Sequence, residues 1–144
     1  MSYFGGETSH SMDAKGRLSL PAKHRKMLPD ELVLAPSPEE FHSLWLFSEA
    51  AFEEWTKEVD EDKGGLLANS ASAQHIIREM FRKQEIVGFD SAGRILIPAH
   101  LRQYASLEKT VKVIGAGKHI EIWNEDILAQ SDALYSNEKI LDLP

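Results

Sequence analysis

Short apolar stretches alternate with polar turns along this chain and predict a mixture of short strands and short helices. Strands are expected at 3–12, 17–20, 32–34, 43–47, 85–89, 95–97, 111–114 and 119–123. Helices are expected at 21–28, 49–58, 70–84 and 98–105, with a last one that starts after Asn124. Ser48 and Asn124 are the residue types that cap helix N-termini, and each stands just before an expected helix. This order predicts an α+β fold.

The strongest feature of the sequence is an internal repeat. Residues 13–25 read DAKGRLSLPAKHR, and residues 90–102 read DSAGRILIPAHLR, 77 positions later. Both copies contain Asp-x-x-Gly-Arg, a short apolar stretch, Pro-Ala and a later Arg. A repeat that occurs twice, with this long spacing, indicates two halves of one domain rather than a solenoid.

Each copy has the local chemistry of a tight turn followed by a strand and a short helix. Asp13 and Asp90 can accept hydrogen bonds from backbone N–H groups further along the turn. Gly16 and Gly93 can adopt the left-handed conformation that closes it. The Pro after each strand suits the first position of a helix. We therefore expect Asp13, Gly16, Asp90 and Gly93 to be structural turn residues.

Composition restricts the class of protein. The 144 residues are 42% hydrophobic and 27% charged, which is typical of one globular domain. The absence of Cys excludes disulfides and thiolate chemistry. Apolar runs are too short to span a membrane, and the first residues lack the pattern of a signal peptide, so a cytoplasmic location is expected.

Charge is unevenly distributed, and this matters because the net charge of −7 argues against a polyanionic partner. Residues 1–30 carry five basic and three acidic side chains, and residues 66–119 carry eight and four. Acidic side chains prevail in 31–65, with ten against two, and in 120–144, with six against one. A basic face around the two repeats can still attract phosphate.

The duplicated motif resembles the MraZ family of bacterial transcriptional regulators. Asp13 to Arg17 and Asp90 to Arg94 match the family's Asp-x-x-x-Arg motif, and Phe4-Gly5, Leu107-Glu-Lys109 and Ile120-Glu-Ile-Trp123 match it further. The resemblance implies an AbrB-like swapped-hairpin fold with both half-barrels in one chain. It also implies a nucleoid-associated, ring-like homo-oligomer, octameric or larger. That ring would bind double-stranded DNA with direct repeats upstream of its own division and cell-wall gene cluster.

The domain organisation follows from the repeat. We expect a first AbrB-like repeat at 1–60, a linker and helix at 61–84, a second repeat at 85–130 and a loosely ordered tail at 131–144. The acidic, glycine-containing stretch 60–65 is the expected linker.

Basic residues near the turns are the candidate DNA contacts. They are Lys15, Arg17, Lys23, Arg25, Lys26, Arg94 and Arg102. Lys15 and Arg17 are expected at the first hairpin tip, with Lys23, Arg25 and Lys26 behind it on the following helix. The second tip has Arg94 and Arg102 nearby in sequence, so the first copy is the stronger candidate. Each motif Arg can instead pair with its own Asp and hold the turn closed, and both readings stay open.

Other functions have weaker support. The His residues show no metal-ligand spacing, and Gly115-Ala-Gly-Lys118 lacks the full phosphate-loop pattern, so we expect no metal, no cofactor and no enzyme. Two alternatives remain. One is an antitoxin-like protein that binds DNA and a toxin; the other is a small hydrolase on a double-psi-type barrel with Asp13 and Asp90 as catalytic carboxylates.

Overall fold

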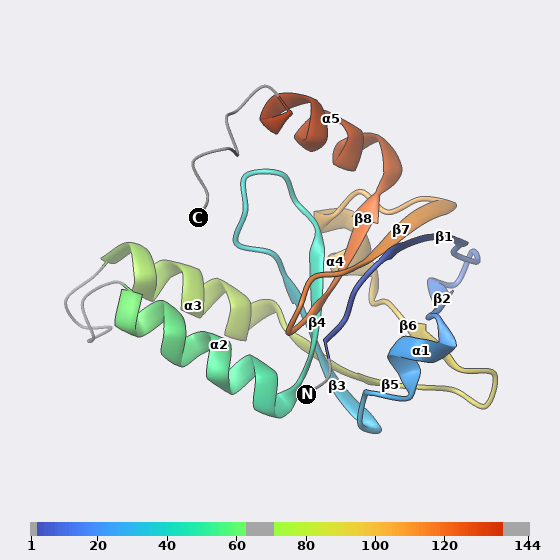
Figure 1. Cartoon of the computed structure of the whole chain (residues 1–144), viewed down its shortest axis with the longest axis horizontal. Helices are drawn as coiled ribbons and strands as arrows, with labels where there is room; N and C mark the ends of the chain where they lie inside the picture. The colour runs from blue at the N-terminus through green and yellow to red at the C-terminus, as the bar shows by residue number, and fades with distance from the viewer. Residues whose placement is uncertain (1–2, 63–70, 137–144) are drawn as a thin grey trace.

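The structure is a computed structural model that describes residues 3–62 and 71–136. It is an α+β fold, as expected, with helices outside a mainly antiparallel sheet (Figure 1). The strands are β1 (Glu7–Ser11), β2 (Arg17–Ser19), β3 (Glu31–Pro36), β4 (Leu44–Ser48), β5 (Glu85–Gly88), β6 (Arg94–Leu96), β7 (Thr110–Gly115) and β8 (Ile120–Asn124). The helices are α1 (Ala22–Arg25), α2 (Glu49–Asp62), α3 (Ala71–Lys83), α4 (Ala99–Tyr104) and α5 (Glu125–Tyr135). No helix among these is long and apolar enough to cross a membrane.

The two halves of the chain exchange strands. The six-stranded sheet has the order β1-β7-β8-β4-β3-β5, so the first strand of each half lies on the sheet of the other half. Strand β1 pairs with β7, and β5 pairs with β3, both antiparallel. Each Asp–Gly turn therefore joins two strands that do not pair with each other. This is the swapped-hairpin arrangement that the resemblance implied.

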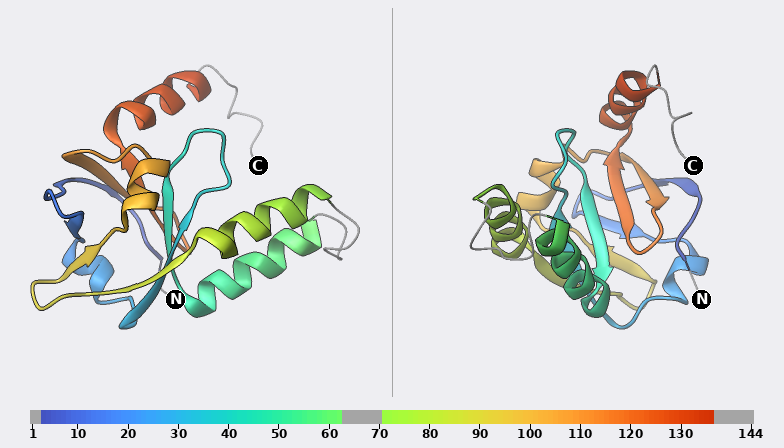
Figure 2. Two further views of the ribbon diagram at one scale, coloured as in Figure 1. Left: turned by 180° about the vertical axis from the view of Figure 1, so that it is seen from behind. Right: turned by 60° about the vertical axis from the view of Figure 1, so that its left-hand side comes forward.

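The strands that follow the two turns pair with each other and form a separate two-stranded ribbon. In this ribbon Leu18 of β2 lies opposite Ile95 of β6, and both side chains are completely buried. Figures 1 and 2 show the ribbon, both Asp–Gly turns and helix α1 at one end of the molecule, opposite the α2–α3 pair. The pairing places equivalent parts of the repeat side by side.

Strand β3 is covered on both faces, which explains why it is apolar from Leu32 to Pro36. From β3, Leu32 and Leu34 pack into the core beneath the ribbon and α4, whereas Val33 and Ala35 face α2 and α3. A strand buried on both faces reads as a continuous hydrophobic run rather than an alternating one. On the second face, Phe52 of α2 and Met80 of α3 complete an aromatic cluster.

Helix ends agree with the expected caps but not with every expected boundary. The Ser48 hydroxyl accepts a hydrogen bond from the N–H of Ala51, and Asn124 accepts one from the N–H of Ile127. Helix α2 continues through Asp62, into the stretch 60–65 that was expected to be a linker. Helix α5 continues through Tyr135, so 131–135 are helical rather than loosely ordered. The remaining parts of these two stretches, 63–65 and 137–144, lie outside the described residues.

Candidate functional site

The two Asp–Gly turns have nearly identical geometry. One Asp13 oxygen accepts hydrogen bonds from the N–H groups of Lys15 (3.0 Å) and Arg17 (2.9 Å). Asp90 accepts the equivalent bonds from Ala92 and Arg94, both at 2.9 Å. The backbone of each turn is closed by a bond from the Gly N–H to the Asp carbonyl oxygen, 3.0 Å long in both copies. In this geometry both aspartates cap their turns.

Each motif arginine also pairs with its own aspartate. Arg17 Nε lies 2.5 Å from Asp13 Oδ2, and Arg94 Nε lies 3.0 Å from Asp90 Oδ2. A terminal nitrogen of Arg94 also lies 3.8 Å from Asp13, which links the two halves. Similar fractions of the two Arg side chains, 36% and 32%, remain exposed. Each aspartate therefore holds its arginine at Nε while the turn stays closed, and about a third of each arginine side chain remains exposed.

These contacts fix the ionisation of both aspartates. Hydrogen bonds from the N–H of Arg17, followed by the side-chain bond and the charge of Arg17, lower the pKa of Asp13. The same contacts from Arg94, with the N–H of Ala92, lower the pKa of Asp90. A pair of catalytic carboxylates needs one member with a raised pKa, so that it can hold a proton. The two aspartates do not have that property, which argues against the hydrolase alternative.

The two halves complete each other's turns. A Cβ atom placed on Gly93 would lie 3.0 Å from Cζ of Arg25, so the Arg25 guanidinium covers the second turn. In the same way Arg102 covers the first turn, with its Nε 2.8 Å from a Cβ placed on Gly16. Arg25 was expected behind the first tip, but its guanidinium lies over the second turn. The antiparallel pairing of β2 with β6 places the start of each helix beside the turn of the other half.

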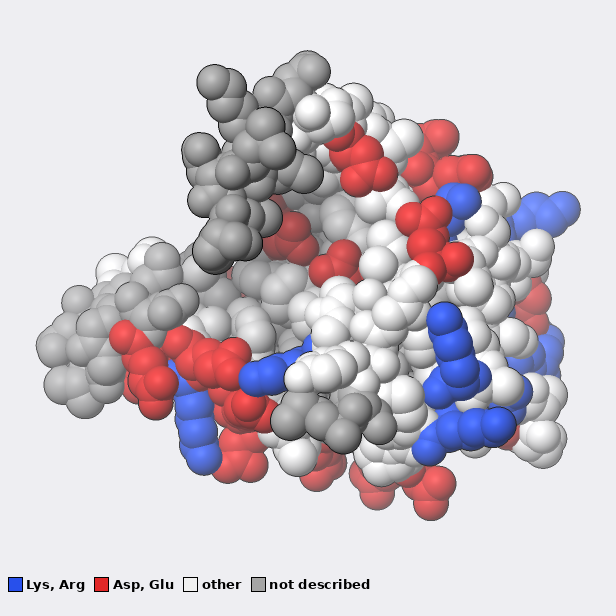
Figure 3. Space-filling model, viewed as in Figure 1, with Lys and Arg blue, Asp and Glu red and all other residues white. Residues whose placement is uncertain are grey.

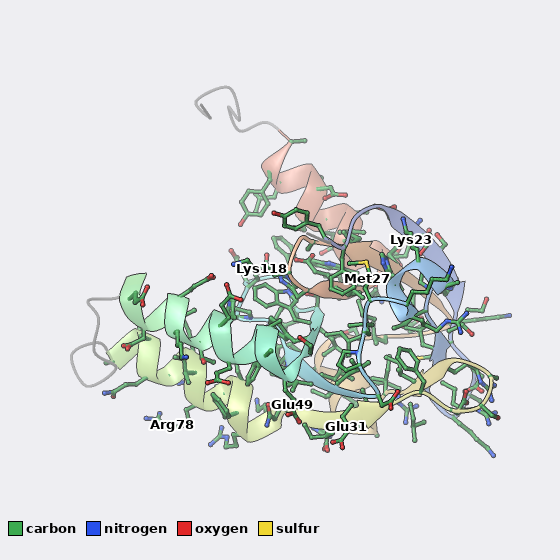
Figure 4. The ribbon with its side chains drawn as sticks, turned by 60° about the horizontal axis from the view of Figure 1, so that its bottom comes forward. Lys23, Met27, Glu31, Glu49, Arg78 and Lys118 are labelled. Carbon is green, nitrogen blue, oxygen red and sulfur yellow. The ribbon has the colours of Figure 1, made fainter. Side chains whose placement is uncertain are left out.

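The remaining basic candidates lie at the same end of the molecule. Lys15, Lys23 and Lys26 are exposed. Figure 3 shows Lys and Arg side chains gathered over α1, while Asp and Glu side chains gather over α2. Lys23 Nζ lies beside Gly6, 2.8 Å from a Cβ placed there, and Figure 4 shows Lys23 on α1 and Met27 just after it. We call this part of the molecule the ribbon end: β2, β6, their two turns, α1 and α4.

One basic residue of the repeat does not belong to this surface. His24 is only 2% exposed and packs edge-on against Phe4, with ring centroids 5.5 Å apart. Burial, with smaller effects from Lys23 and His10, lowers its pKa and favours the neutral ring. The sequence contains the signal for this, because the second copy has Leu101, a fully buried residue, at the equivalent position.

The opposite end of the molecule is acidic and contains its own ion pairs. Lys118, in the turn between β7 and β8, lies 2.8 Å from Glu54 and 2.9 Å from Glu58 of α2 (Figure 4). Hydrogen bonds to these two carboxylates raise the pKa of Lys118. Among the described residues no group of His, Asp and Glu is arranged to hold a metal ion.

Comparison with known proteins identifies the family. A family described as "MraZ protein, putative antitoxin-like" matches residues 3–65 and 80–136. A protein of Dechloromonas aromatica is 37% identical over 98% of this chain and 94% of its own length. Proteins of Desulforamulus reducens and Carboxydothermus hydrogenoformans are 33% and 36% identical, over 97% and 86% of this chain and over 99% and 82% of their own lengths. All three proteins are named "Transcriptional regulator MraZ", and none of them is named as an enzyme. The chain belongs to the MraZ family.

Proposed function

We propose that the chain is a transcriptional regulator that binds specific DNA sequences through the ribbon end. The observation that supports this proposal is the convergence of basic side chains from both halves on one exposed surface. Lys15 and Arg17 come from the first turn and β2, Arg94 from β6, and Arg25 and Arg102 from α1 and α4. Neither half alone would bring these five groups together.

The arginines have different chemistry within this surface. Arg17 and Arg94 are held at Nε by a carboxylate and remain about one-third exposed. A guanidinium held in this way can use its terminal nitrogens to contact the edge of a guanine. Arg25, Arg102, Lys15, Lys23 and Lys26 surround them and are suited to phosphate contacts, which fix position rather than sequence. Of the two motif arginines, we assign base reading mainly to Arg17. Arg94 contacts both aspartates and has the larger structural role.

Assembly is part of this proposal. One ribbon end contacts few base pairs, and a net charge of −7 opposes binding to DNA at physiological salt. Linked sites raise affinity through effective concentration. We therefore propose a ring-like homo-oligomer, octameric or larger, that binds direct repeats upstream of its own division and cell-wall gene cluster. Such a protein would act in the cytoplasm, associated with the nucleoid.

The test compares three variants on DNA from upstream of the protein's own gene. Arg17→Ala should abolish specific binding with little loss of stability, because each guanine contact contributes about 1–3 kcal/mol per subunit. Arg94→Ala should lower the melting temperature and weaken binding less. Arg78→Ala is the matched control, because it removes the same charge from exposed α3 at the opposite end (Figure 4). Binding is measured by fluorescence anisotropy over a range of salt concentrations, and stability by thermal unfolding.

Three outcomes would contradict parts of the proposal. If affinity for the upstream DNA does not fall steeply between low and moderate salt, phosphate contacts do not drive binding. If Arg94→Ala removes binding in a fully stable protein while Arg17→Ala does not, base reading belongs to the second half. A protein that remains monomeric in light scattering at micromolar concentration, yet binds one box tightly, would contradict the oligomer.

A further inference from the structure

The exposed face of the β2–β6 ribbon carries four side chains in a compact arrangement. Alternation along the strands buries Leu18 and Ile95 and turns their neighbours outward. Arg17 lies opposite Leu96, and Ser19 lies opposite Arg94. The ribbon therefore presents two arginines on one diagonal, with Ser19 and Leu96 on the other.

Leu96 is an unexpected residue on this face. Its side chain is 54% exposed, although the residues around it are arginine, serine and the charged turns. A single exposed leucine needs no explanation on an ordinary surface. Here it lies directly beside Arg17, at the centre of the surface that we propose for DNA.

The repeat shows that this leucine is a difference between the halves. Arg17 and Arg94 occupy equivalent positions in the two copies, and so do Ser19 and Leu96, each pair 77 residues apart. The two strands of the ribbon are thus related by an approximate twofold axis. The arginines obey this symmetry, whereas Ser19 and Leu96 break it. Because of this difference, the two orientations of the ribbon end along a DNA duplex are not equivalent.

We propose that the ribbon enters the major groove and that Leu96 contacts the C5-methyl group of a thymine beside the guanine read by Arg17. This inference rests on the proposed function. The major groove accepts a two-stranded ribbon, and apolar side chains recognise thymine there through its methyl group. Ser19 occupies the equivalent place beside Arg94, where its hydroxyl can bond any base. The ribbon end would therefore bind each DNA repeat in one orientation, which is what direct repeats require.

A second copy of the chain is the other candidate to cover Leu96. Charge favours DNA, because a second copy that met this face in a symmetric contact would bring Arg17 and Arg94 against their own equivalents. DNA supplies negative charge around an apolar methyl group, which matches both parts of the surface. The two occupants give different results in the experiment below.

The experiment uses the full chain and DNA from upstream of its own gene, in which each thymine of one box is replaced in turn by deoxyuridine. Deoxyuridine lacks the C5-methyl group and keeps every hydrogen-bonding atom. The wild-type chain should lose about fourfold in affinity at one thymine position, which corresponds to burial of one methyl-sized group at about 0.8 kcal/mol. Leu96→Ala should bind the thymine box more weakly and no longer distinguish thymine from deoxyuridine there.

Two further variants make the result specific. Leu96→Ser introduces the residue of the first copy and should also lose the distinction. Ile86→Ala is the matched control, because Ile86 is similarly exposed, at 49%, on β5 outside the ribbon. It should retain the fourfold preference. Thermal unfolding and light scattering are measured on all variants.

Several results would overturn the inference. If Leu96→Ala keeps the preference, or if the wild-type chain has none at any position, Leu96 does not read thymine. If Leu96→Ala changes the oligomer mass and leaves the preference intact, a second copy covers this face. If the wild-type chain binds no upstream DNA, the proposed function fails together with this inference, which is a distinguishable result.

Discussion

Gly16 gives the sharpest test of the architecture, because both its conformation and its surroundings oppose a side chain. Its φ of +91° lies in the region that L-residues rarely adopt. A Cβ there would also lie 2.8 Å from the carbonyl oxygen of Ile97 and 2.8 Å from Nε of Arg102, both from the other half. The Gly16 carbonyl accepts a hydrogen bond from the Ile97 N–H, 2.9 Å long, so the backbone there is held in place.

These contacts allow the cost of Gly16→Ala to be divided into two parts. The left-handed conformation costs about 1–2 kcal/mol for any L-residue. Forcing a methyl group against a fixed backbone oxygen adds about 1–3 kcal/mol, the usual cost of overpacking. We expect a total loss of about 2–5 kcal/mol in the free energy of unfolding. For a chain of this size that corresponds to a fall in melting temperature of roughly 5–20 °C.

Two other glycines separate the two parts. Gly117 has a similar φ of +85° but nothing within 4 Å of a Cβ atom, so Gly117→Ala should show the conformational cost alone. Gly93 has a φ of +76° and meets only the side chain of Arg25, which can move. Gly93→Ala should therefore fall between the others in stability and displace Arg25 from the ribbon end. Urea unfolding of the three variants measures this order. If Gly16→Ala is no less stable than Gly117→Ala, the packing of Arg102 and Ile97 over the first turn is wrong.

Three further predictions concern the packing of the ribbon on the core and the dependence of stability on pH. Leu18→Ala should cost about 2–5 kcal/mol in urea unfolding, because Leu18 is fully buried, whereas Leu96→Ala on the exposed face should change stability by less than about 0.5 kcal/mol. The lowered pKa of Asp13 means that its stabilising effect is complete above about pH 4 and is lost as pH falls through the folded-state pKa. Asp13→Asn should therefore lower the melting temperature at pH 7, and the melting temperature of this variant should fall less steeply below pH 4 than that of the wild-type chain. The lowered pKa of His24 means that the unfolded chain binds more protons just below pH 6.5, so acidification there should destabilise the wild-type chain and have less effect on His24→Leu.

Local signals in the sequence were sufficient for the order of the elements and for the turns. The Asp-x-x-Gly-Arg pattern predicts a turn capped by Asp, and both turns have that structure. The caps at Ser48 and Asn124 also depend on neighbouring residues, and both are confirmed. Such features can be predicted because the atoms that form them lie within a few residues of one another in the chain.

The contacts between the halves could not be predicted from neighbouring residues. Nothing near Arg25 in the sequence indicates that its guanidinium covers Gly93, because that contact depends on the antiparallel pairing of β2 with β6. The ends of α2 and α5 were missed for a different reason. Residues 60–62 are all acidic, and Ser131 and Asp132 are weak helix formers, so the local pattern does not predict that either helix continues. Both helices nevertheless extend through these residues.

The exchange between halves has a consequence for how the proposed DNA surface can work. Each turn is capped by its own Asp but covered by an Arg from the other half, so neither turn is complete until both halves are folded together. Two separate chains related by exact symmetry would have to place the same residue at both equivalent positions. A single chain with two copies is free of that constraint, and the copies differ where the ribbon is exposed: Lys15 against Ala92, and Ser19 against Leu96. The arginines and aspartates that are the same in both copies maintain the shape of the ribbon end. The positions that differ would make its two orientations on DNA inequivalent. A symmetric pair of turns would bind a DNA repeat equally well in either orientation. Such a surface could not distinguish direct repeats from inverted repeats.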